Sequence, residues 1–282
     1  MTQNLYIGPF AFSVKGDMFP QGDSFTELFS YPIDNHYIPV EVIFQYSSFL
    51  NFVGQKIYGG DSFDVYIDGN TEHRYYHQVI DGKKNFYAHN SLKEHTICID
   101  LYTGATTFGR ALDIWRFLFL EKLLLEMDGI ILHSSSVLWN DQILLFTAPS
   151  GTGKSTQANL WKKYEAAKVV NGDRNILIRY LGKRYCCGIP WHGSSSDCRN
   201  IWAPIRCISV IRQYPMDEIR PLSPARKVMY LYSELSKNSW DITFTDKCFQ
   251  LLTEMITSLN IVQQNCTMNR TAVECLIKAL EE

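Results

Sequence analysis

The chain has 282 residues, of which 46% are hydrophobic and 20% are charged, a composition typical of a folded globular protein with one large or two modest domains. This balance excludes a disordered or fibrous chain. The 27 basic and 29 acidic residues leave a formal net charge of -2, so the strongly positive field of a dedicated nucleic-acid-binding protein is also excluded. Any site for a polyanion must therefore be local.

The sequence predicts a cytoplasmic protein that does not associate with a membrane. The residues after Met1 have neither the basic start nor the apolar run of a signal peptide. The most apolar segment, Leu112–Met127, is interrupted by charged residues and is expected to be a buried helix. The eight cysteines show no Cys-x-x-Cys spacing, so we expect reduced, mostly buried thiols and no structural zinc.

Residues 1–108 are predicted to form a β-rich recognition domain. Tyr37–Gln45 and Phe63–Ile67 are rich in β-branched and aromatic residues, which favour strands, and His95–Leu101 is expected to be the last strand. Asp-Gly dipeptides in this region favour hairpin turns, because glycine tolerates a positive φ. We expect an antiparallel β layer, whose many Tyr and Phe side chains either cover a thin sheet or form a binding face.

Residues 109–282 show alternating helix and strand patterns, which predict an α/β domain with a mixed sheet. Gly129 is expected to end the first helix, and Thr271 with Glu274 forms a capping box that would begin the last one. The other predicted helices and strands are Ala111–Asp128, Lys154–Ala166, Pro224–Lys237 and Phe244–Leu259 (helices), and Ile130–Leu138, Gln142–Ala148, Lys168–Val170, Ile176–Tyr180, Tyr185–Ile189, Cys207–Arg212 and Ile261–Gln264 (strands).

The segment Ala148–Ser155, Ala-Pro-Ser-Gly-Thr-Gly-Lys-Ser, fits the phosphate-loop (P-loop) pattern with alanine in place of the usual first glycine. It follows the apolar run Ile143–Phe146 and opens a predicted helix, which is the strand–loop–helix setting that this motif requires. The alternative is a glycine-rich turn without a ligand.

Each residue type in this loop has a physical role in binding a nucleoside triphosphate. Gly151 and Gly153 let the backbone curl so that successive N–H groups point at an anion, and the start of the helix adds partial positive charge. Lys154 would place its ammonium group on the β- and γ-phosphates, and the hydroxyl of Ser155 could bind Mg²⁺. The residues expected to contact the nucleotide are Ser150, Gly151, Thr152, Gly153, Lys154, Ser155 and Thr156.

A carboxylate is expected beside the loop. Asp173 follows the short apolar strand that begins near Lys168, a position where it could bind Mg²⁺ or act as a general base. The same residues, Asn-Gly-Asp, are also common in simple turns between strands. The spacing leaves both interpretations open.

A histidine is expected at the mouth of the loop. If the strands 130–138 and 142–148 form a hairpin that turns on Asn140, His133 lies opposite Thr147. There it could orient or deprotonate an acid, contact phosphate, or simply hydrogen-bond within the sheet.

Further along, Gly188–Ser196 resembles a mobile loop that closes over a substrate, with His192 as a weak candidate. Arg199 and Arg206 could meet the charge on a transferred phosphoryl group, or could be solvated surface residues.

These segments together resemble the HPr kinase/phosphorylase superfamily, which shares its nucleotide core with phosphoenolpyruvate carboxykinases. The resemblance covers residues 130–280. Within the superfamily, the chain most resembles HPr-kinase-like proteins linked to peptide-modification systems. It implies an HPr-kinase-like P-loop core preceded by the β-rich domain. The segments that carry the resemblance are His133, Ala148–Ser155, Gly172–Arg174, Gly188–Gly193, Ser155–Trp161 and Asn265–Val273.

The resemblance implies ATP-dependent phosphorylation of a serine on a protein or peptide. Lys154 would be a catalytic and nucleotide-binding residue, Ser155 and Asp173 would bind Mg²⁺, and His133 would be the family's histidine. One departure is that HPr kinases have two adjacent acids where this chain has the single Asp173 between Gly172 and Arg174. Another is Thr156, where those kinases have an acid.

We therefore predict a two-domain, ATP- and Mg²⁺-dependent serine kinase in which Asp173 or His133 accepts the proton of the acceptor hydroxyl. Its partner would be a protein or peptide substrate and not a nucleic acid, and the family's tendency to assemble allows for a homo-oligomer. The alternatives are a kinase for a small-molecule hydroxyl and a non-catalytic, ATP-dependent binding or switch module. A carboxykinase would need a longer chain and clustered Lys and His ligands.

Overall fold

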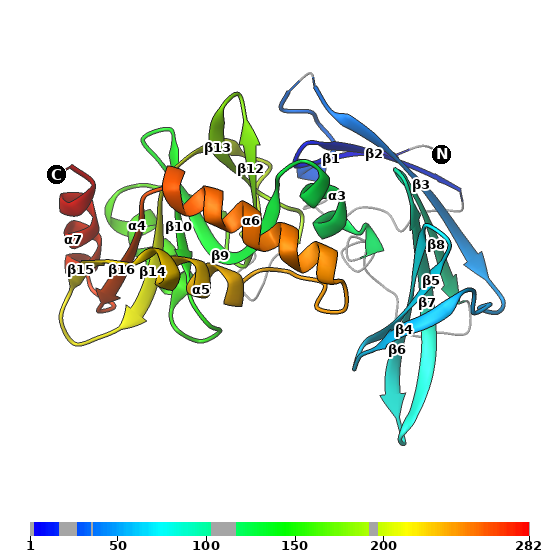
Figure 1. Ribbon diagram of the computed structural model, residues 1–282. Helices are drawn as coiled ribbons and strands as arrows, with labels where there is room; N and C mark the ends of the chain where they lie inside the picture. Colours follow the sequence, from blue (N-terminus) through cyan, green and yellow to red (C-terminus); the bar gives the residue numbers. More distant parts are fainter. Residues whose placement is uncertain (1–2, 17–26, 35, 103–116, 192–196, 282) are drawn as a thin grey trace. The chain divides into compact units, whose positions relative to one another are not determined.

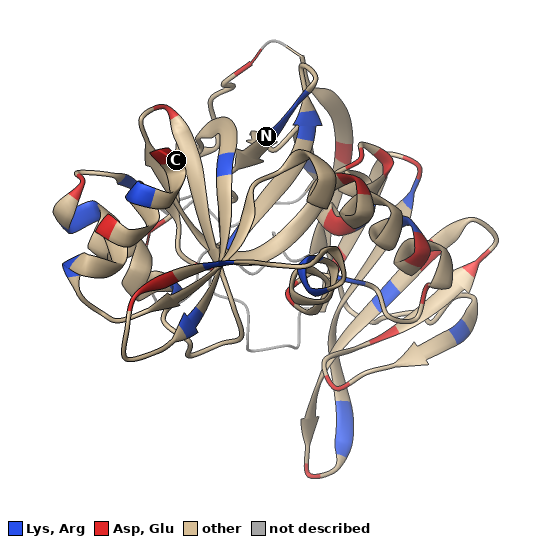
Figure 2. Cartoon of the chain, turned by 60° about the vertical axis from the view of Figure 1, so that its left-hand side comes forward, with Lys and Arg blue, Asp and Glu red and all other residues tan. Residues whose placement is uncertain are grey.

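The structure is a computed structural model that describes residues 3–16, 27–34, 36–102, 117–191 and 197–281 (Figure 1). The chain divides into two compact units, Met1–Leu120 and Glu121–Glu282. The domain boundary predicted at residue 108 lies outside the described residues. Acidic and basic residues are interspersed along the elements of each unit (Figure 2).

Unit 1 contains an eight-stranded sheet in the order β1-β2-β3-β8-β7-β6-β5-β4. It is mixed, not antiparallel as expected, because β2 pairs with β3 and β3 with β8 in parallel. Parallel neighbours need a long connection, and four intervening strands separate β3 from β8 along the chain. The strands are β1 (Gln3–Ile7), β2 (Phe10–Gly16), β3 (Ile38–Ser47), β4 (Gln55–Gly59), β5 (Phe63–Asp68), β6 (Thr71–Ile80), β7 (Lys83–Lys93) and β8 (Thr96–Tyr102).

The aromatic residues of unit 1 lie both inside and outside its core. Phe12 and Phe44 are fully buried, whereas Phe49 and Phe52 are at least half exposed. Aromatic side chains therefore fill the unit as expected and also leave apolar surface on it.

Unit 2 is a mixed α/β structure, as predicted. Its sheet has the order β10-β9-β12-β13-β14-β16-β15, β11 pairs with β9, and β10 also pairs with β14. The strands are β9 (Ile130–Trp139), β10 (Gln142–Thr147), β11 (Lys168–Asn171), β12 (Arg174–Tyr180), β13 (Lys183–Cys187), β14 (Trp202–Gln213), β15 (Glu218–Pro221) and β16 (Ile261–Cys266). The helices are α3 (Leu120–Glu126), α4 (Lys154–Tyr164), α5 (Pro224–Ser233), α6 (Ile242–Ser258) and α7 (Arg270–Glu281).

The first predicted helix is shorter than expected. Its described part is α3, and residues 117–119 before it are not α-helical. Asp128, with φ 52°, takes the left-handed conformation that was assigned to Gly129. Gly129 is needed for another reason, because a Cβ there would lie 2.8 Å from Cγ2 of Ile178.

The capping box predicted at Thr271 does not begin the last helix, because α7 already begins at Arg270. The Thr271 hydroxyl instead donates to Asp217 Oδ2 at 2.5 Å. Asp217 Oδ1 also accepts the N–H of Thr267 at 2.7 Å, so this carboxylate stabilises the connection between β16 and α7.

Strand β10 is buried on both faces, which explains the continuous apolar run before the predicted P-loop. Leu145 belongs to a core cluster with α5 and α6, whereas Leu144 and Phe146 pack in a cluster with α4 and α7. Trp161 of α4 is fully buried in the second cluster, with its ring centroid 5.1 Å from that of Trp139. The helix that follows the loop is thereby fixed against the sheet.

All eight cysteines are free thiols and six are buried. Burial raises the pKa of Cys248 and of Cys266 to about 11, so these thiols stay protonated near neutral pH. Among the described residues, none of the helices is both long and apolar enough to span a membrane.

We predict that Trp161→Ala lowers the free energy of unfolding by about 3–5 kcal/mol, because it leaves a cavity between α4 and the sheet. Urea denaturation followed by circular dichroism measures this loss. Trp161→Phe, which keeps an aromatic ring, should cost less. A loss below about 1 kcal/mol for the alanine variant would contradict the packing described here.

Candidate functional site

The segment between β10 and α4 has the backbone geometry of an anion-binding loop. Gly151 and Gly153 have φ values of 79° and 104°, which strain any other residue. Gly153 is the N-cap of α4, and within the described chain no side chain caps the first N–H groups of this helix. A Cβ built on Gly151 would meet no atom within 4 Å, so the loop faces open space. The uncapped amides fit a phosphate group.

Lys154 extends back across this loop. Its side chain is buried, and its ammonium group donates to the carbonyl oxygens of Ala148 at 2.7 Å and Pro149 at 3.3 Å. Burial lowers the pKa of Lys154, while the negative charges of Glu234 and Asp173 act against this shift. A positive charge is thus held inside the curl of the loop.

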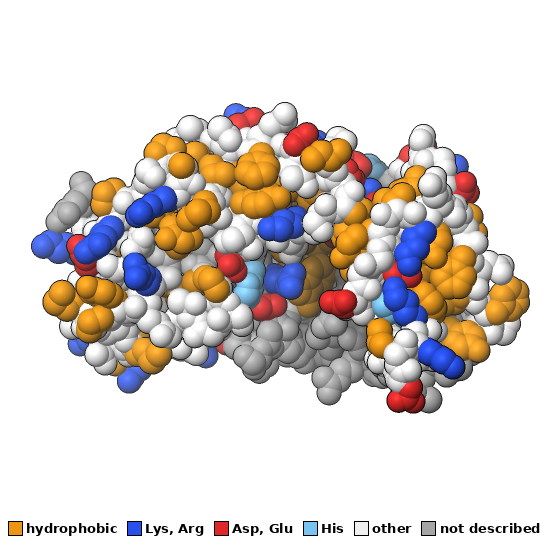
Figure 3. All heavy atoms as spheres, turned by 60° about the horizontal axis from the view of Figure 1, so that its bottom comes forward, with side chains coloured by type: hydrophobic (Ala, Val, Ile, Leu, Met, Phe, Trp, Pro, Cys, Tyr) orange, Lys and Arg blue, Asp and Glu red, His pale blue; other side chains and the backbone are white. Residues whose placement is uncertain are grey.

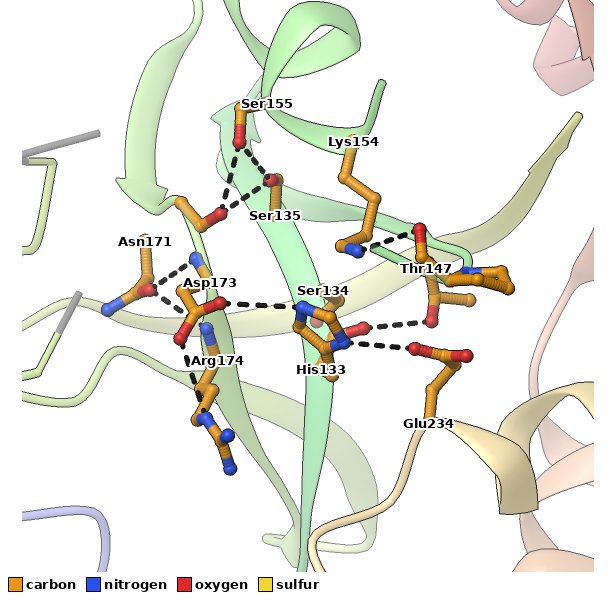
Figure 4. Close-up of polar contacts among 12 residues, drawn as sticks. His133, Ser134, Ser135, Thr147, Lys154, Ser155, Asn171, Asp173, Arg174 and Glu234 are labelled. Carbon is orange, nitrogen blue, oxygen red and sulfur yellow. Dashed lines mark hydrogen bonds and ion pairs between the residues drawn. The ribbon is translucent and has the colours of Figure 1, made fainter. Parts of the chain in front are cut away.

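Two serine hydroxyls join the loop to the turn that carries Asp173. Ser135 Oγ donates to the carbonyl oxygen of Gly172 at 2.8 Å, and Ser155 Oγ donates to the same oxygen at 3.3 Å (Figure 4). The two hydroxyls lie 3.4 Å apart. The loop and the segment around Asp173, distant in the sequence, therefore lie beside each other.

Asp173 is held in an ionised state. Its Oδ1 lies 3.4 Å from Nε2 of His133 and its Oδ2 lies 3.4 Å from Nε of Arg174. The hydrogen bond from His133 lowers the pKa of Asp173, burial opposes this, and the charge of Arg174 adds to the lowering. Asn171 Oδ1 fixes the turn by accepting the N–H groups of Asp173 and Arg174 at 2.8 and 3.0 Å.

The strand register that places His133 in the site differs from the predicted one. Thr147 pairs with Ser134 and not with His133, because both turn residues, Asn140 and Asp141, have positive φ and form a two-residue hairpin turn. Thr147 still contacts His133, since its hydroxyl donates to the histidine carbonyl oxygen at 3.0 Å. Instead, His133 faces Arg174 of β12, beside Asp173.

Glu234 was missed by the sequence analysis. Its Oε2 lies 2.9 Å from Nδ1 of His133, so the imidazole lies between two carboxylates (Figure 4). The helix predicted to run to Lys237 ends at Ser233, and Glu234 is its C-cap. An acid at a helix C-terminus opposes the helix dipole, and this is the one signal in the sequence that could have drawn attention to it.

The ionisable side chains of the site reach the molecular surface. The side chains of His133, Asp173 and Arg174 are 28%, 29% and 43% exposed. Figure 3 shows a histidine together with acidic and basic side chains on one face of the protein. A ligand can therefore approach this group from solvent.

The other residues predicted to contact the nucleotide differ in their exposure. Ser150 and Gly151 are exposed, Thr152 and Thr156 are half-buried, and the Thr152 hydroxyl donates to Pro149 within the loop at 2.8 Å. His192 and the centre of its loop lie outside the described residues.

The two arginines predicted to meet phosphoryl charge both make structural contacts. Arg206 donates to Gln142 at 3.0 Å and to the carbonyl oxygen of Leu280 at 2.8 Å, at the end of β10 opposite the loop. Arg199 donates to the carbonyl oxygen of Val169 at 3.0 Å and so supports β11. Arg206 therefore lies away from the loop, and Arg199, an exposed residue, uses its Nε–H for a structural contact.

No protein-family model matches the chain, and a search of curated proteins gives no match. Among solved structures it is similar to the Hpr(Ser) kinase/phosphatase from Coxiella burnetii, with a TM-score of 0.30 and 12% sequence identity over 54% of this chain and 93% of that one. A likeness at this level defines neither fold nor activity.

We predict that Asp173 stabilises the fold only while it is ionised. Its pKa is lower in the folded chain than the ordinary 3.8, so its contribution is present above pH 3.8 and is lost as the pH falls through the lowered value. Asp173→Asn should therefore unfold at a lower urea concentration than the native chain at pH 7, and the difference should shrink below pH 3.8. A difference that is independent of pH would contradict the charge interactions described for Asp173.

Proposed function

We propose that the chain is an ATP-dependent phosphotransferase that transfers the γ-phosphoryl group of ATP to a serine hydroxyl of a protein or peptide. The observation that carries the proposal is the junction at Gly172. Its carbonyl oxygen accepts the hydroxyl of Ser155, the last residue of the loop, and its neighbour Asp173 is an ionised carboxylate. An anion-binding loop and a carboxylate beside it are the two parts that phosphoryl transfer requires.

The loop would hold the phosphates of ATP through the amides of residues 151–155 and the ammonium group of Lys154. Ser155 and Asp173 fit a Mg²⁺ ion by their chemistry, since a hydroxyl and a carboxylate are oxygen ligands. When bound there, Mg²⁺ would neutralise phosphate charge. The expected contacts of Ser150, Thr152 and Thr156 belong to the same proposal.

The side chains of the chain would supply positioning and charge, which account for most of the catalysis in phosphoryl transfer. The hydrogen bond from His133 and the charge of Arg174 keep Asp173 ionised, and Asn171 fixes the turn in which Asp173 and Arg174 lie. Asp173 or His133 would accept the proton of the acceptor hydroxyl. The side chains of both are about 30% exposed, so an acceptor can reach them.

A second candidate is an ATP-dependent binding or switch module. It is favoured by the residues that flank Asp173, which are Gly172 and Arg174 and not a second acid. Exposed aromatic residues of unit 1, such as Phe49 and Phe52, would suit partner binding by such a module.

Incubation of the chain with Mg-ATP and the protein products of neighbouring genes, followed by mass spectrometry, tests these candidates. A serine phosphate ester on one of them supports the proposed function. Transfer only to free serine or a sugar would replace the protein acceptor with a small molecule. Release of ADP without any modified acceptor would overturn the kinase in favour of the switch.

We predict that Lys154→Ala weakens ATP binding by about tenfold or more, which corresponds to about 1.4 kcal/mol. The reason is the loss of the buried ammonium group inside the loop. Isothermal titration calorimetry measures the affinity, with Lys162→Ala as the control, because Lys162 is an exposed lysine of the same helix. Equal affinity for ATP in the two variants would contradict the proposal that the loop binds the nucleotide.

We also predict that Asp173→Asn keeps ATP affinity within a few-fold but lowers the transfer rate by about 10²-fold or more. The substitution keeps the size of the side chain and removes its charge. Asp246→Asn changes an exposed aspartate of α6 and serves as the control. A fully active Asp173→Asn variant would exclude Asp173 from the mechanism.

A further inference from the structure

We propose that Glu234 is a positioning residue, whose carboxylate accepts the Nδ1–H of His133 and so turns Nε2 of the ring toward Asp173 and the nucleotide loop. The effect on phosphoryl transfer rests on the proposed function. The positioning itself rests only on contacts within unit 2.

The first argument is the difference between the two contacts of the ring. Nδ1 of His133 lies 2.9 Å from Glu234, whereas Nε2 lies 3.4 Å from Asp173. A protonated ring donates to both carboxylates, whereas a neutral ring has one N–H to donate, and the shorter contact, to Glu234, has the better hydrogen-bond geometry. A carboxylate that accepts Nδ1–H fixes both the tautomer and the orientation of a histidine, leaving Nε2 as the acceptor.

The second argument is that Glu234 is itself held rigidly. Its carbonyl oxygen accepts the N–H of His133 at 2.9 Å, and the N–H of Ser236 donates to Ile131 at 3.0 Å. Leu235 forms a β-bridge with Leu132 between these two bonds. The chain after α5 thus adds to the edge of β9, and one residue contacts His133 through both its backbone and its side chain.

The third argument is that the carboxylate of Glu234 occupies a position that the helix dipole disfavours. The side chain of Glu234 is only 9% exposed, and it lies at the negative end of the α5 dipole. Lys154 attracts it, but the ammonium group of Lys154 hydrogen-bonds to loop carbonyls and, within the described chain, makes no ion pair with Glu234. The carboxylate receives a hydrogen bond from the Ser233 hydroxyl at 3.5 Å and has its shorter contact, 2.9 Å, with His133, which is the contact that links it to the site.

The residues next to Asp173 lack a second carboxylate. Glu234, at the end of α5, supplies one. The two acids do not lie side by side, because the imidazole ring of His133 separates them. Asp173 can then bind a metal while His133, oriented by Glu234, faces the acceptor hydroxyl. Glu234 acts through His133 and does not touch the reacting atoms.

The tautomer of His133 can be measured without nucleotide. Long-range ¹⁵N–¹H spectra of the neutral ring show which nitrogen carries the proton, and His133→Ala identifies the signals. We expect the Nδ1–H form in the native chain and in Asp173→Asn, and a shift toward the Nε2–H form in Glu234→Ala. Glu234→Gln, whose amide oxygen can still accept Nδ1–H, should restore the native form. An unchanged tautomer in Glu234→Ala would overturn the proposal.

Kinetics provide the second readout. We expect Glu234→Ala to lower kcat by about 10²-fold with little change in the KM for ATP, because general-base assistance is worth about 10²–10⁴-fold. In a His133→Ala background the same substitution should cost nothing further, since the two residues act as a unit. Additive losses would contradict this. Glu274→Ala, which removes an exposed glutamate paired with Arg270, is the matched control.

The two proposals fail in different ways. A chain that shows the tautomer shift but transfers no phosphoryl group would keep the positioning role and overturn the proposed function. A chain that transfers phosphate, with an unchanged tautomer and unchanged kcat in Glu234→Ala, would keep the function and overturn the positioning role. If Glu234→Ala does not fold, Glu234→Asp, which shortens the side chain and keeps its charge, gives the same comparison.

Discussion

The site depends on strand β9, because this strand joins all of its parts. It pairs with β10, which leads into the loop, with β11 and β12, which flank the turn at Asp173, and with the segment that follows α5. Three successive residues of β9 make different contacts. His133 contacts the two acids and Ser134 pairs with Thr147. Ser135 connects the loop to Gly172. A shift of β9 by one residue would move these side chains to the opposite faces of the sheet and dismantle the site.

Side chains of opposite charge lie close to β9 and are partly buried. Burial within the loop lowers the pKa of Lys154, and the negative charges of Glu234 and Asp173 oppose this shift. Asp173 is in turn kept ionised by His133 and Arg174. Because each buried charge has an opposite charge near it, the group can remain desolvated without losing its ionisation. Such a group is suited to receiving a polyanion, whose phosphates would add negative charge beside Lys154.

The local parts of this site could be predicted from the sequence, whereas the long-range parts could not. The loop was predictable because Gly151, Gly153 and Lys154 have roles that depend only on neighbouring residues. The position of His133 was wrong by one residue, because the register depends on whether the hairpin turns on Asn140 alone or on Asn140 and Asp141 together. Glu234 was not found, since 101 residues separate it from His133 and the helix before it, α5, was expected to continue past it. The parallel pairings of β3 were missed for the same reason.

The central claim is that the loop and the turn at Asp173 form one nucleotide site, and backbone amide spectra recorded during a titration with ATP test it most directly. The account predicts that the amide signals of residues 151–155, Ser135 and Asp173 shift together and saturate at the same ATP concentration. Shifts confined to other parts of the chain, or a loop that responds while Asp173 and Ser135 do not, would contradict it.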